Sequence, residues 1–204
     1  MIILGLNVFH ADTSACIVRD GKLVAAVEEE RFTRIKHFTG FPKNSIDFCL
    51  NYSNLTLNEI DIIFTALPDG EAQVISKYLL KKNTLIDLAA DFRLNKSLDY
   101  KKWYKQKHKA INNIKKSIYA LPEITEKKVK NFEIIGCPGC YPTSILLPLI
   151  PLIKKKSINT NNIHIDSKSG YSGAGRGVHK KYKNKNLYES ISAYGIGNHR
   201  HNPE

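Results

Sequence analysis

Apolar runs of strand length alternate with amphipathic segments in the middle of the chain, and this alternation restricts the fold more than any other feature. Residues 60–67 and 84–88 are two such apolar runs. Residues 71–82 lie between them and place Ile75 and Leu79 at helical spacing. A strand, a helix and a second strand in succession are typical of a β-α-β unit, whose strands lie parallel. The sequence therefore predicts an α/β fold with a parallel sheet.

The first thirty residues follow a different pattern, because three strand-length runs come in direct succession. Asp20-Gly21, between the last two runs, is typical of a tight hairpin turn, so we expect a β-meander here. The further elements predicted by the sequence are strands over residues 2–8, 15–19, 22–28, 132–135 and 163–166, and helices over residues 44–52, 103–118 and 144–153.

The net charge of +12 is distributed unevenly along the chain. Residues 1–62 hold six Lys or Arg against eight Asp or Glu, so the remainder holds 25 against 11. Aromatic residues interleave with lysines in residues 100–109 and 179–185, a composition compatible with nucleic-acid binding. No recognised nucleic-acid motif accompanies the charge, so we favour a solvated lysine-rich surface and expect no nucleic-acid partner.

The four cysteines point to a reducing compartment. The opening residues 1–6 are too short an apolar run for a secretory leader or a membrane span. We therefore expect free thiols, a cytoplasmic location and no membrane partner.

Residues 137–140, here called the cysteine turn, carry the strongest chemical signal. Cys140 follows a predicted strand, and Pro142 lies where the first turn of a helix accepts proline. A helix N-terminus stabilises a thiolate, which would make Cys140 a nucleophile at neutral pH. A buried structural cysteine is the alternative, and the surrounding Pro-Gly and Tyr-Pro-Thr favour the catalytic interpretation.

Cys137 and Cys140 also form a C-x-x-C pair, which allows two other interpretations. A zinc site needs a second pair of ligands at suitable spacing, and the sequence offers none. A redox pair of the thioredoxin type normally lies near the start of a short α/β domain. We expect neither a metal site nor a redox pair.

Six motifs, taken together and in order, resemble those of the N-acetyl-gamma-glutamyl-phosphate reductases. They are residues 66–70, 86–93, 119–123, 138–143, 168–176 and 199–204. The resemblance implies NADPH-dependent reduction of an acyl phosphate, N-acetylglutamyl phosphate, to the semialdehyde in arginine biosynthesis. It also implies a partial Rossmann-like parallel sheet over residues 63–136. That sheet would lead into an α+β catalytic domain of the semialdehyde dehydrogenase type over residues 137–204.

The same resemblance assigns the reacting groups. Cys140 would attack the acyl phosphate and form a thioester, which hydride from NADPH would reduce. His199 would be the acid-base partner, with His201 as the alternative.

Binding roles follow from the resemblance as well. Arg93, Arg200 and Glu204 would bind the substrate, although Arg93 is equally compatible with an exposed surface arginine. The NADP cofactor would lie against the glycine loop formed by Ser172, Gly173, Ala174 and Gly175.

Residues 1–62 resemble something else, the opening of the carbamoyltransferase family. The matching segments are residues 5–16, 20–37 and 40–42. The resemblance implies an actin- or kinase-like β-hairpin with His10 and Asp12 in a carbamoyl-phosphate or nucleotide pocket. For these two residues the favoured interpretation is a solvated hairpin edge.

The two resemblances meet near residues 58–64, so we hypothesise a recombined or misassembled gene. The glycine-rich turn that holds a dinucleotide pyrophosphate should precede Phe64 and is absent. The chain also stops inside the histidine motif, so we expect an incomplete reductase, inactive alone, that would form a homo-oligomer only with its missing parts. The alternatives are an O-carbamoyltransferase fragment and a non-catalytic basic binding protein.

Overall fold

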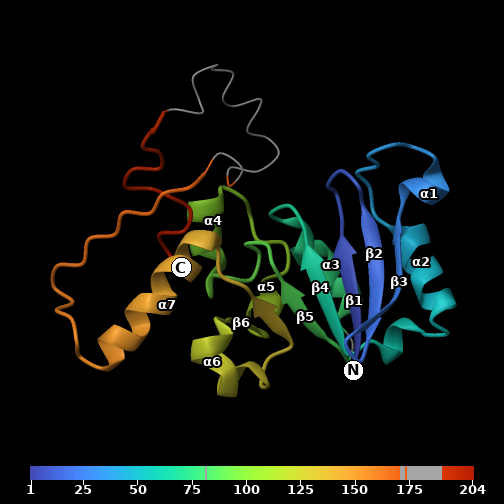
Figure 1. Ribbon diagram of the computed structural model, residues 1–204, viewed down its shortest axis with the longest axis horizontal. Helices are drawn as coiled ribbons and strands as arrows, with labels where there is room; N and C mark the ends of the chain where they lie inside the picture. Colours follow the sequence, from blue (N-terminus) through green and yellow to red (C-terminus); the bar gives the residue numbers. More distant parts are fainter. Residues whose placement is uncertain (81, 171–172, 174–189) are drawn as a thin grey trace. The chain divides into compact units, whose positions relative to one another are not determined.

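A mixed sheet organises the first part of the chain (Figure 1). In the computed structural model, which describes residues 1–80, 82–170, 173 and 190–204, seven strands form this sheet in the order β3-β2-β1-β4-β5-β7-β6. The strands are β1 (Ile2–Asn7), β2 (Ser14–Arg19), β3 (Lys22–Glu28), β4 (Ile62–Ala66), β5 (Thr84–Asp87), β6 (Ser117–Tyr119) and β7 (Ile134–Gly136). The first three pair antiparallel, and β1, β4, β5, β7 and β6 pair parallel. The predicted α/β fold with a parallel sheet is confirmed.

The N-terminal meander and the parallel strands belong to one sheet. β1 pairs directly with β4 in parallel register, from Ile3 opposite Ile62 to Asn7 opposite Ala66. Asp61 anchors this junction, because its carboxylate accepts the Ile2 N–H at 2.7 Å and its own N–H donates to the Ile2 carbonyl at 2.9 Å. The predicted boundary between the two resembled families, near residue 62, thus lies at the start of the central strand β4. That boundary stays a prediction.

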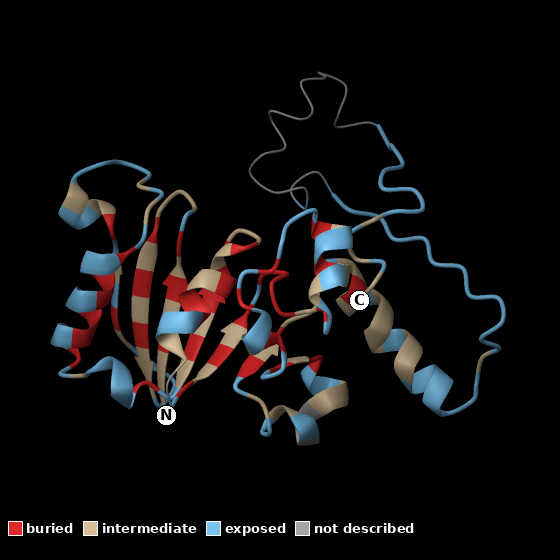
Figure 2. Ribbon diagram, turned by 180° about the vertical axis from the view of Figure 1, so that it is seen from behind, coloured by how far each residue is buried: buried red, intermediate tan, exposed pale blue. Residues whose placement is uncertain are grey.

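Seven helices connect or follow the strands in the described part of the chain. They are α1 (Glu30–Thr33), α2 (Lys43–Tyr52), α3 (Glu71–Leu79), α4 (Ser97–Tyr104), α5 (Ile111–Ile114), α6 (Pro122–Val129) and α7 (Cys140–Lys154), with a 3-10 turn at Leu57–Glu59. Alternate strand residues are buried, which Figure 2 shows as red and tan bands along the strands. The most buried of these are Leu4, Ile17, Ile63, Leu85 and Ile134, and α2 packs against β2 and β3 beside them.

The predicted helix over residues 103–118 is wrong. Lys105 adopts a left-handed conformation with φ of 59° and ends α4. His108 then hydrogen-bonds the Asp91 carbonyl through Nε2 at 2.9 Å, and the Lys109 N–H donates to Gln73 Oε1 at 2.6 Å. These tertiary bonds hold the segment as a loop, and the chain continues into α5 and β6 instead.

The chain divides into two units, each described by itself. The first comprises Met1–Cys140 with Pro203–Glu204, and the second comprises Tyr141–Asn202. The second unit holds most of α7, which continues through two prolines, and the predicted strand over residues 163–166 is wrong. Ile163 and Ile165 are exposed, and none of the described strand pairings includes this segment. Among the described helices, none has the length and apolar character that crossing a membrane requires.

Candidate active site

The cysteine turn lies at the carboxyl edge of the parallel strands. It follows β7, and the Cys137 N–H donates to the Asp87 carbonyl at the end of β5 at 2.9 Å. Cys140 is the first residue of α7 and is exposed, so the helix begins at the nucleophile candidate rather than at residue 144. Gly136 must be glycine, because a Cβ there would collide with the carbonyl of Phe92.

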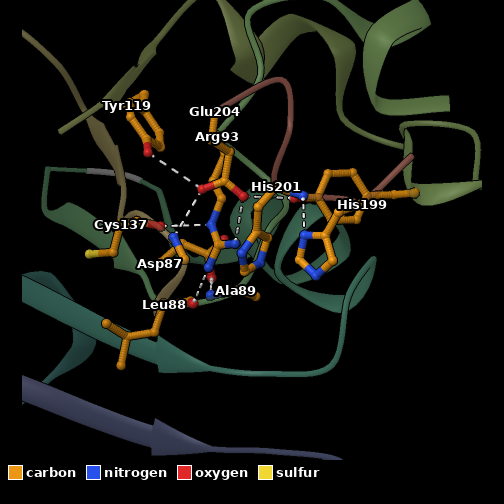
Figure 3. Close-up of polar contacts among 11 residues, drawn as sticks. Asp87, Leu88, Ala89, Arg93, Tyr119, Cys137, His199, His201 and Glu204 are labelled. Carbon is orange, nitrogen blue, oxygen red and sulfur yellow. Dashed lines mark hydrogen bonds and ion pairs between the residues drawn. The ribbon is translucent and has the colours of Figure 1, made fainter. Parts of the chain in front are cut away.

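Arg93 reaches the cysteine turn from the loop after β5 (Figure 3). Its Nε donates to the Cys137 carbonyl at 2.7 Å, and its Nη2 donates to the Leu88 carbonyl at 3.1 Å. Its Nη1 pairs with Glu204 Oε1 at 3.0 Å. Only 8% of the Arg93 side chain and none of the Glu204 side chain is exposed, so a surface arginine is the wrong interpretation.

Glu204 gathers four donors around its carboxylate. Oε1 accepts from Arg93 and from the Tyr104 hydroxyl at 3.1 Å. Oε2 accepts from the Gly139 N–H at 2.9 Å and from the Tyr119 hydroxyl at 3.4 Å. Burial opposes the charge of Arg93, but the Glu204 carboxylate outweighs it and the pKa of Arg93 is raised. Arg93 therefore stays charged, and the Glu204 carboxylate compensates its buried charge.

The two thiols of the cysteine turn differ in environment. Cys137 is half-buried, and burial together with the nearby Asp87 carboxyl raises the pKa of its thiol. Burial also raises the pKa of Asp87, helped by Asp91, to about 7. Asp87 Oδ1 accepts from Thr65 and from the Ala89 N–H, whereas Oδ2 has no hydrogen-bond partner among the described residues. Cys137 is thus disfavoured as a thiolate, and Cys140 is the accessible sulfur.

In the second unit, two tyrosines and two histidines form an aromatic cluster. The ring of Tyr141, the residue after Cys140, meets His199 edge-on at 5.4 Å and His201 at 6.0 Å between centroids. Its hydroxyl lies 2.6 Å from that of Tyr194. The His201 N–H donates to His199 Nδ1 at 3.2 Å, so a neutral His199 ring carries its proton on Nε2.

The structure gives few contacts for the predicted cofactor loop and for Arg200. Ser172, Ala174 and Gly175 lie outside the described residues, and the Gly173 N–H donates to the Gly170 carbonyl at 3.0 Å. Arg200 is exposed. The roles predicted for these residues stay predictions.

The described residues do not fit the pyrophosphate of a dinucleotide. Such a group needs a glycine-rich turn between the first strand and a helix N-terminus, but β1 returns as the antiparallel strand β2. The strand-turn-helix after β4 does have a glycine, Gly70. There the N–H groups of Gly70 and Gln73 donate instead to the buried Asp91 carboxylate at 2.6 and 3.3 Å. An internal carboxylate thus occupies the place that a phosphate would take.

At the hairpin end, His10 and Asp12 take part in local hydrogen bonds. Asp12 Oδ1 lies 2.8 Å from His37 Nδ1, and the His10 carbonyl accepts the Thr13 hydroxyl at 3.0 Å. An open cavity of about 660 Å³ lies over β1, β2, β3 and β4, lined in part by Cys16 and Arg31, but neither His10 nor Asp12 lines it. The two residues stay a predicted solvated edge.

Comparison with protein families divides the chain at the cysteine turn. Residues 2–139 match the family described as carbamoyltransferase N-terminus, and residues 140–204 match the semialdehyde dehydrogenase, dimerisation domain. A probable chloroplastic N-acetyl-gamma-glutamyl-phosphate reductase of Arabidopsis thaliana is 46% identical over 145 residues, which is 71% of this chain and 36% of that protein. The chain therefore belongs to the carbamoyltransferase N-terminus family, and it is also similar to N-acetyl-gamma-glutamyl-phosphate reductases.

Bacterial reductases extend this match. The enzyme of Lachnospira eligens is 48% identical over 72% of this chain, and that of Desulforamulus reducens is 43% identical over 82% of it. These alignments cover 43% and 48% of the two relatives, so the chain spans less than half of their length. Because the dimerisation domain matches only residues 140–204, the reductase similarity extends well into the range that the carbamoyltransferase family matches.

Among solved structures, YeaZ from Pseudomonas aeruginosa is 12% identical with a TM-score of 0.29. The match covers 49% of this chain and 48% of that one, a likeness too slight to specify the fold.

Proposed function

We propose that this chain takes part in the NADPH-dependent reduction of N-acetylglutamyl phosphate to N-acetylglutamate semialdehyde, with Cys140 as the nucleophile. The Cys140 thiolate attacks the acyl carbon, the bond from that carbon to the phosphate oxygen breaks, and inorganic phosphate leaves. An N-acetylglutamyl thioester remains on the sulfur. This acyl transfer is the part of the reaction that the residues of the chain supply.

The position of Cys140 carries the proposal. Cys140 is exposed and is the first residue of the 15-residue helix α7. It lies at the carboxyl edge of the parallel strands, where ligands of α/β proteins bind. The partial positive charge at the helix N-terminus stabilises both the thiolate and an approaching phosphate. Gly139 and Tyr141, on either side of it in sequence, both contact residues of the histidine motif.

His199 is proposed as the acid-base residue. Its Nδ1 accepts the His201 N–H, which leaves Nε2–H of the neutral ring as a donor. A proton on Nε2 suits a general acid that assists collapse of the tetrahedral intermediate. This geometry favours His199 over His201 for the role.

The cofactor and the assembly are further parts of the proposal. In the semialdehyde dehydrogenase type of reaction, NADPH supplies the hydride that reduces the thioester. Since the described residues form no pyrophosphate cradle, we assign no step to the cofactor and keep residues 172–175 as its proposed contacts. The match to a dimerisation domain favours a homo-oligomer, and the four free thiols favour a reducing cytoplasm.

The test measures phosphate-dependent reduction of NADP by N-acetylglutamate semialdehyde, the reverse reaction, in the purified chain. We expect any activity to disappear in Cys140→Ser and to persist in Cys137→Ser, the matched control within the same turn. Activity that survives in Cys140→Ser would contradict the nucleophile assignment.

The match of residues 2–139 favours an O-carbamoyltransferase as the second candidate. Turnover of carbamoyl phosphate that is insensitive to Cys140→Ser, without any reductase activity, would support it over the reductase.

A further inference from the structure

We propose that Arg93 and Glu204 are positioning residues, a buried ion pair that holds the cysteine turn in the conformation its nucleophile needs. The proposal rests on the proposed function only in taking Cys140 as the nucleophile. It differs from the sequence-based prediction, in which both residues bind the substrate.

The pair fixes the backbone of the turn at two points. Arg93 Nε donates to the Cys137 carbonyl at 2.7 Å, and Glu204 Oε2 accepts the Gly139 N–H at 2.9 Å. The Cys137 N–H is held separately by the Asp87 carbonyl, and Pro138 has no N–H to place. The backbone is therefore held on both sides of Pro138, immediately before the nucleophile.

Several further hydrogen bonds hold the side chains of Arg93 and Glu204 in place. Arg93 Nη1 bonds Glu204 Oε1 at 3.0 Å, and further bonds come from Leu88, Tyr104 and Tyr119. Charge-assisted bonds are short and directional, and in a buried site they hold their geometry better than neutral ones. The two side chains thus act as a rigid clamp between the loop after β5 and the cysteine turn.

Burial and charge argue against direct substrate contact. The Glu204 carboxylate is fully buried, and the Arg93 side chain is 8% exposed. N-acetylglutamyl phosphate carries a carboxylate and a phosphate, which a bare Glu204 would repel. The ion pair of Arg93 and Glu204 has no net charge. It can therefore lie beneath the anionic substrate without repelling it. Glu204 also lies five residues after His199, so the same contact anchors the end of the histidine motif.

The first experiment measures amide hydrogen exchange by NMR in the wild-type chain and in Glu204→Gln. The variant keeps the size of the side chain and removes the charge. We expect exchange of the Gly139 amide to accelerate at least tenfold, while the amides of β1 and β4 keep their protection. Glu133→Gln is the matched control, because Glu133 pairs with Lys116 at 2.8 Å in an exposed ion pair next to the same strands. Unchanged exchange at Gly139 in Glu204→Gln would overturn the proposal.

The second experiment separates positioning from substrate binding. Phosphate release from N-acetylglutamyl phosphate is followed in single-turnover mode as a function of substrate concentration. We expect the maximal acylation rate of Glu204→Gln to fall at least tenfold, with the half-saturating concentration unchanged within twofold. A half-saturating concentration that rises tenfold at an unchanged maximal rate would make Glu204 a substrate ligand and contradict the positioning role.

Two further outcomes stay distinguishable. If the wild-type chain releases no phosphate but Gly139 exchange still accelerates in Glu204→Gln, the proposed function fails and the clamp stands. If Glu204→Gln does not fold, Tyr104→Phe removes a single neutral donor from Glu204 Oε1 and serves as the milder variant. It should accelerate Gly139 exchange about threefold, and no change in a folded Tyr104→Phe would overturn the proposal.

Discussion

Glu29 gives the sharpest stability prediction, because its carboxylate holds the start of α2 from a position with 1% exposure. Oε1 accepts from the Asn44 N–H at 3.2 Å and from Asn44 Nδ2 at 2.6 Å. Oε2 accepts from the Ser45 N–H at 2.8 Å and from the Ser45 hydroxyl at 2.7 Å. Two of these four donors are backbone N–H groups of the first turn of α2, which the helix cannot satisfy internally, so the Glu29 carboxylate satisfies them instead.

In Glu29→Gln one of the two oxygens becomes an NH₂ group that faces donors. The Ser45 hydroxyl can rotate to accept, but one backbone N–H of the first turn is left unmatched. An unsatisfied buried donor costs about 1–3 kcal/mol, and the loss of charge weakens the remaining bonds. We expect the free energy of unfolding to fall by about 2–4 kcal/mol, a large part of the 5–15 kcal/mol typical of a domain.

The assay is urea unfolding at pH 7, followed by circular dichroism. Glu28→Gln is the matched control, since Glu28 is exposed and adjacent, and we expect it to stay within about 0.5 kcal/mol of the wild type. If Glu29→Gln is no less stable than Glu28→Gln, the reasoning is refuted.

The pH dependence of Glu29 provides a second check. Burial alone would raise its pKa, but the bonds from Ser45 and Asn44 outweigh burial and the pKa is lowered. A lowered pKa in the folded state stabilises the protein above the unfolded value of about 4.3, and the stabilisation disappears as the pH falls through the folded pKa. The difference in unfolding free energy between wild type and Glu29→Gln should therefore shrink as the pH falls, and a difference that stays constant down to the lowest pH at which both proteins fold would contradict this account.

Three further predictions concern the site. In the folded state the pKa of Asp87 is raised to about 7, above the ordinary value of about 3.9. The free energy of unfolding should therefore decline as the pH rises from about 4 to 7. In a pH series of thermal melts, Asp87→Asn should remove that decline. Gly136→Ala should lower the free energy of unfolding by at least about 2 kcal/mol in urea titrations, because its Cβ meets the Phe92 carbonyl. In peptide-resolved labelling with iodoacetamide at pH 7, Cys140 should react at least tenfold faster than Cys137, whose thiol is half-buried with a raised pKa.

Much of the fold follows from local pattern. Six of the seven predicted strand runs, all except residues 163–166, and the Asp20-Gly21 turn are confirmed, with positive φ at both turn residues as a tight hairpin requires. The pairing of β1 with β4 is not visible in the sequence, because it depends on the contact of Asp61 with Ile2 across 59 residues. The predicted helix over residues 103–118 is wrong for a related reason, since His108 and Lys109 bond to distant partners.

Only part of the candidate active site could be predicted from the sequence. Its cysteine turn is recognisable because strand, Pro-Gly, cysteine and helix are contiguous in sequence. The Arg93–Glu204 pair joins residues 111 positions apart, and each alone resembles a substrate ligand. Asp87 was missed, because its raised pKa results from burial within the folded sheet and from the proximity of Asp91. The only sequence signal for Asp87 is a carboxylate at the end of an apolar strand. This signal does not indicate how deeply the carboxyl group is buried.

The most direct test of the central claim is mass spectrometry of the chain after brief exposure to N-acetylglutamyl phosphate without NADPH. Acylation precedes hydride transfer, so it does not depend on a cofactor site. The account predicts an N-acetylglutamyl group on the peptide that contains Cys140, with one phosphate released per chain. Phosphate release without an acyl group on Cys140, or an acyl group on another cysteine, would contradict it.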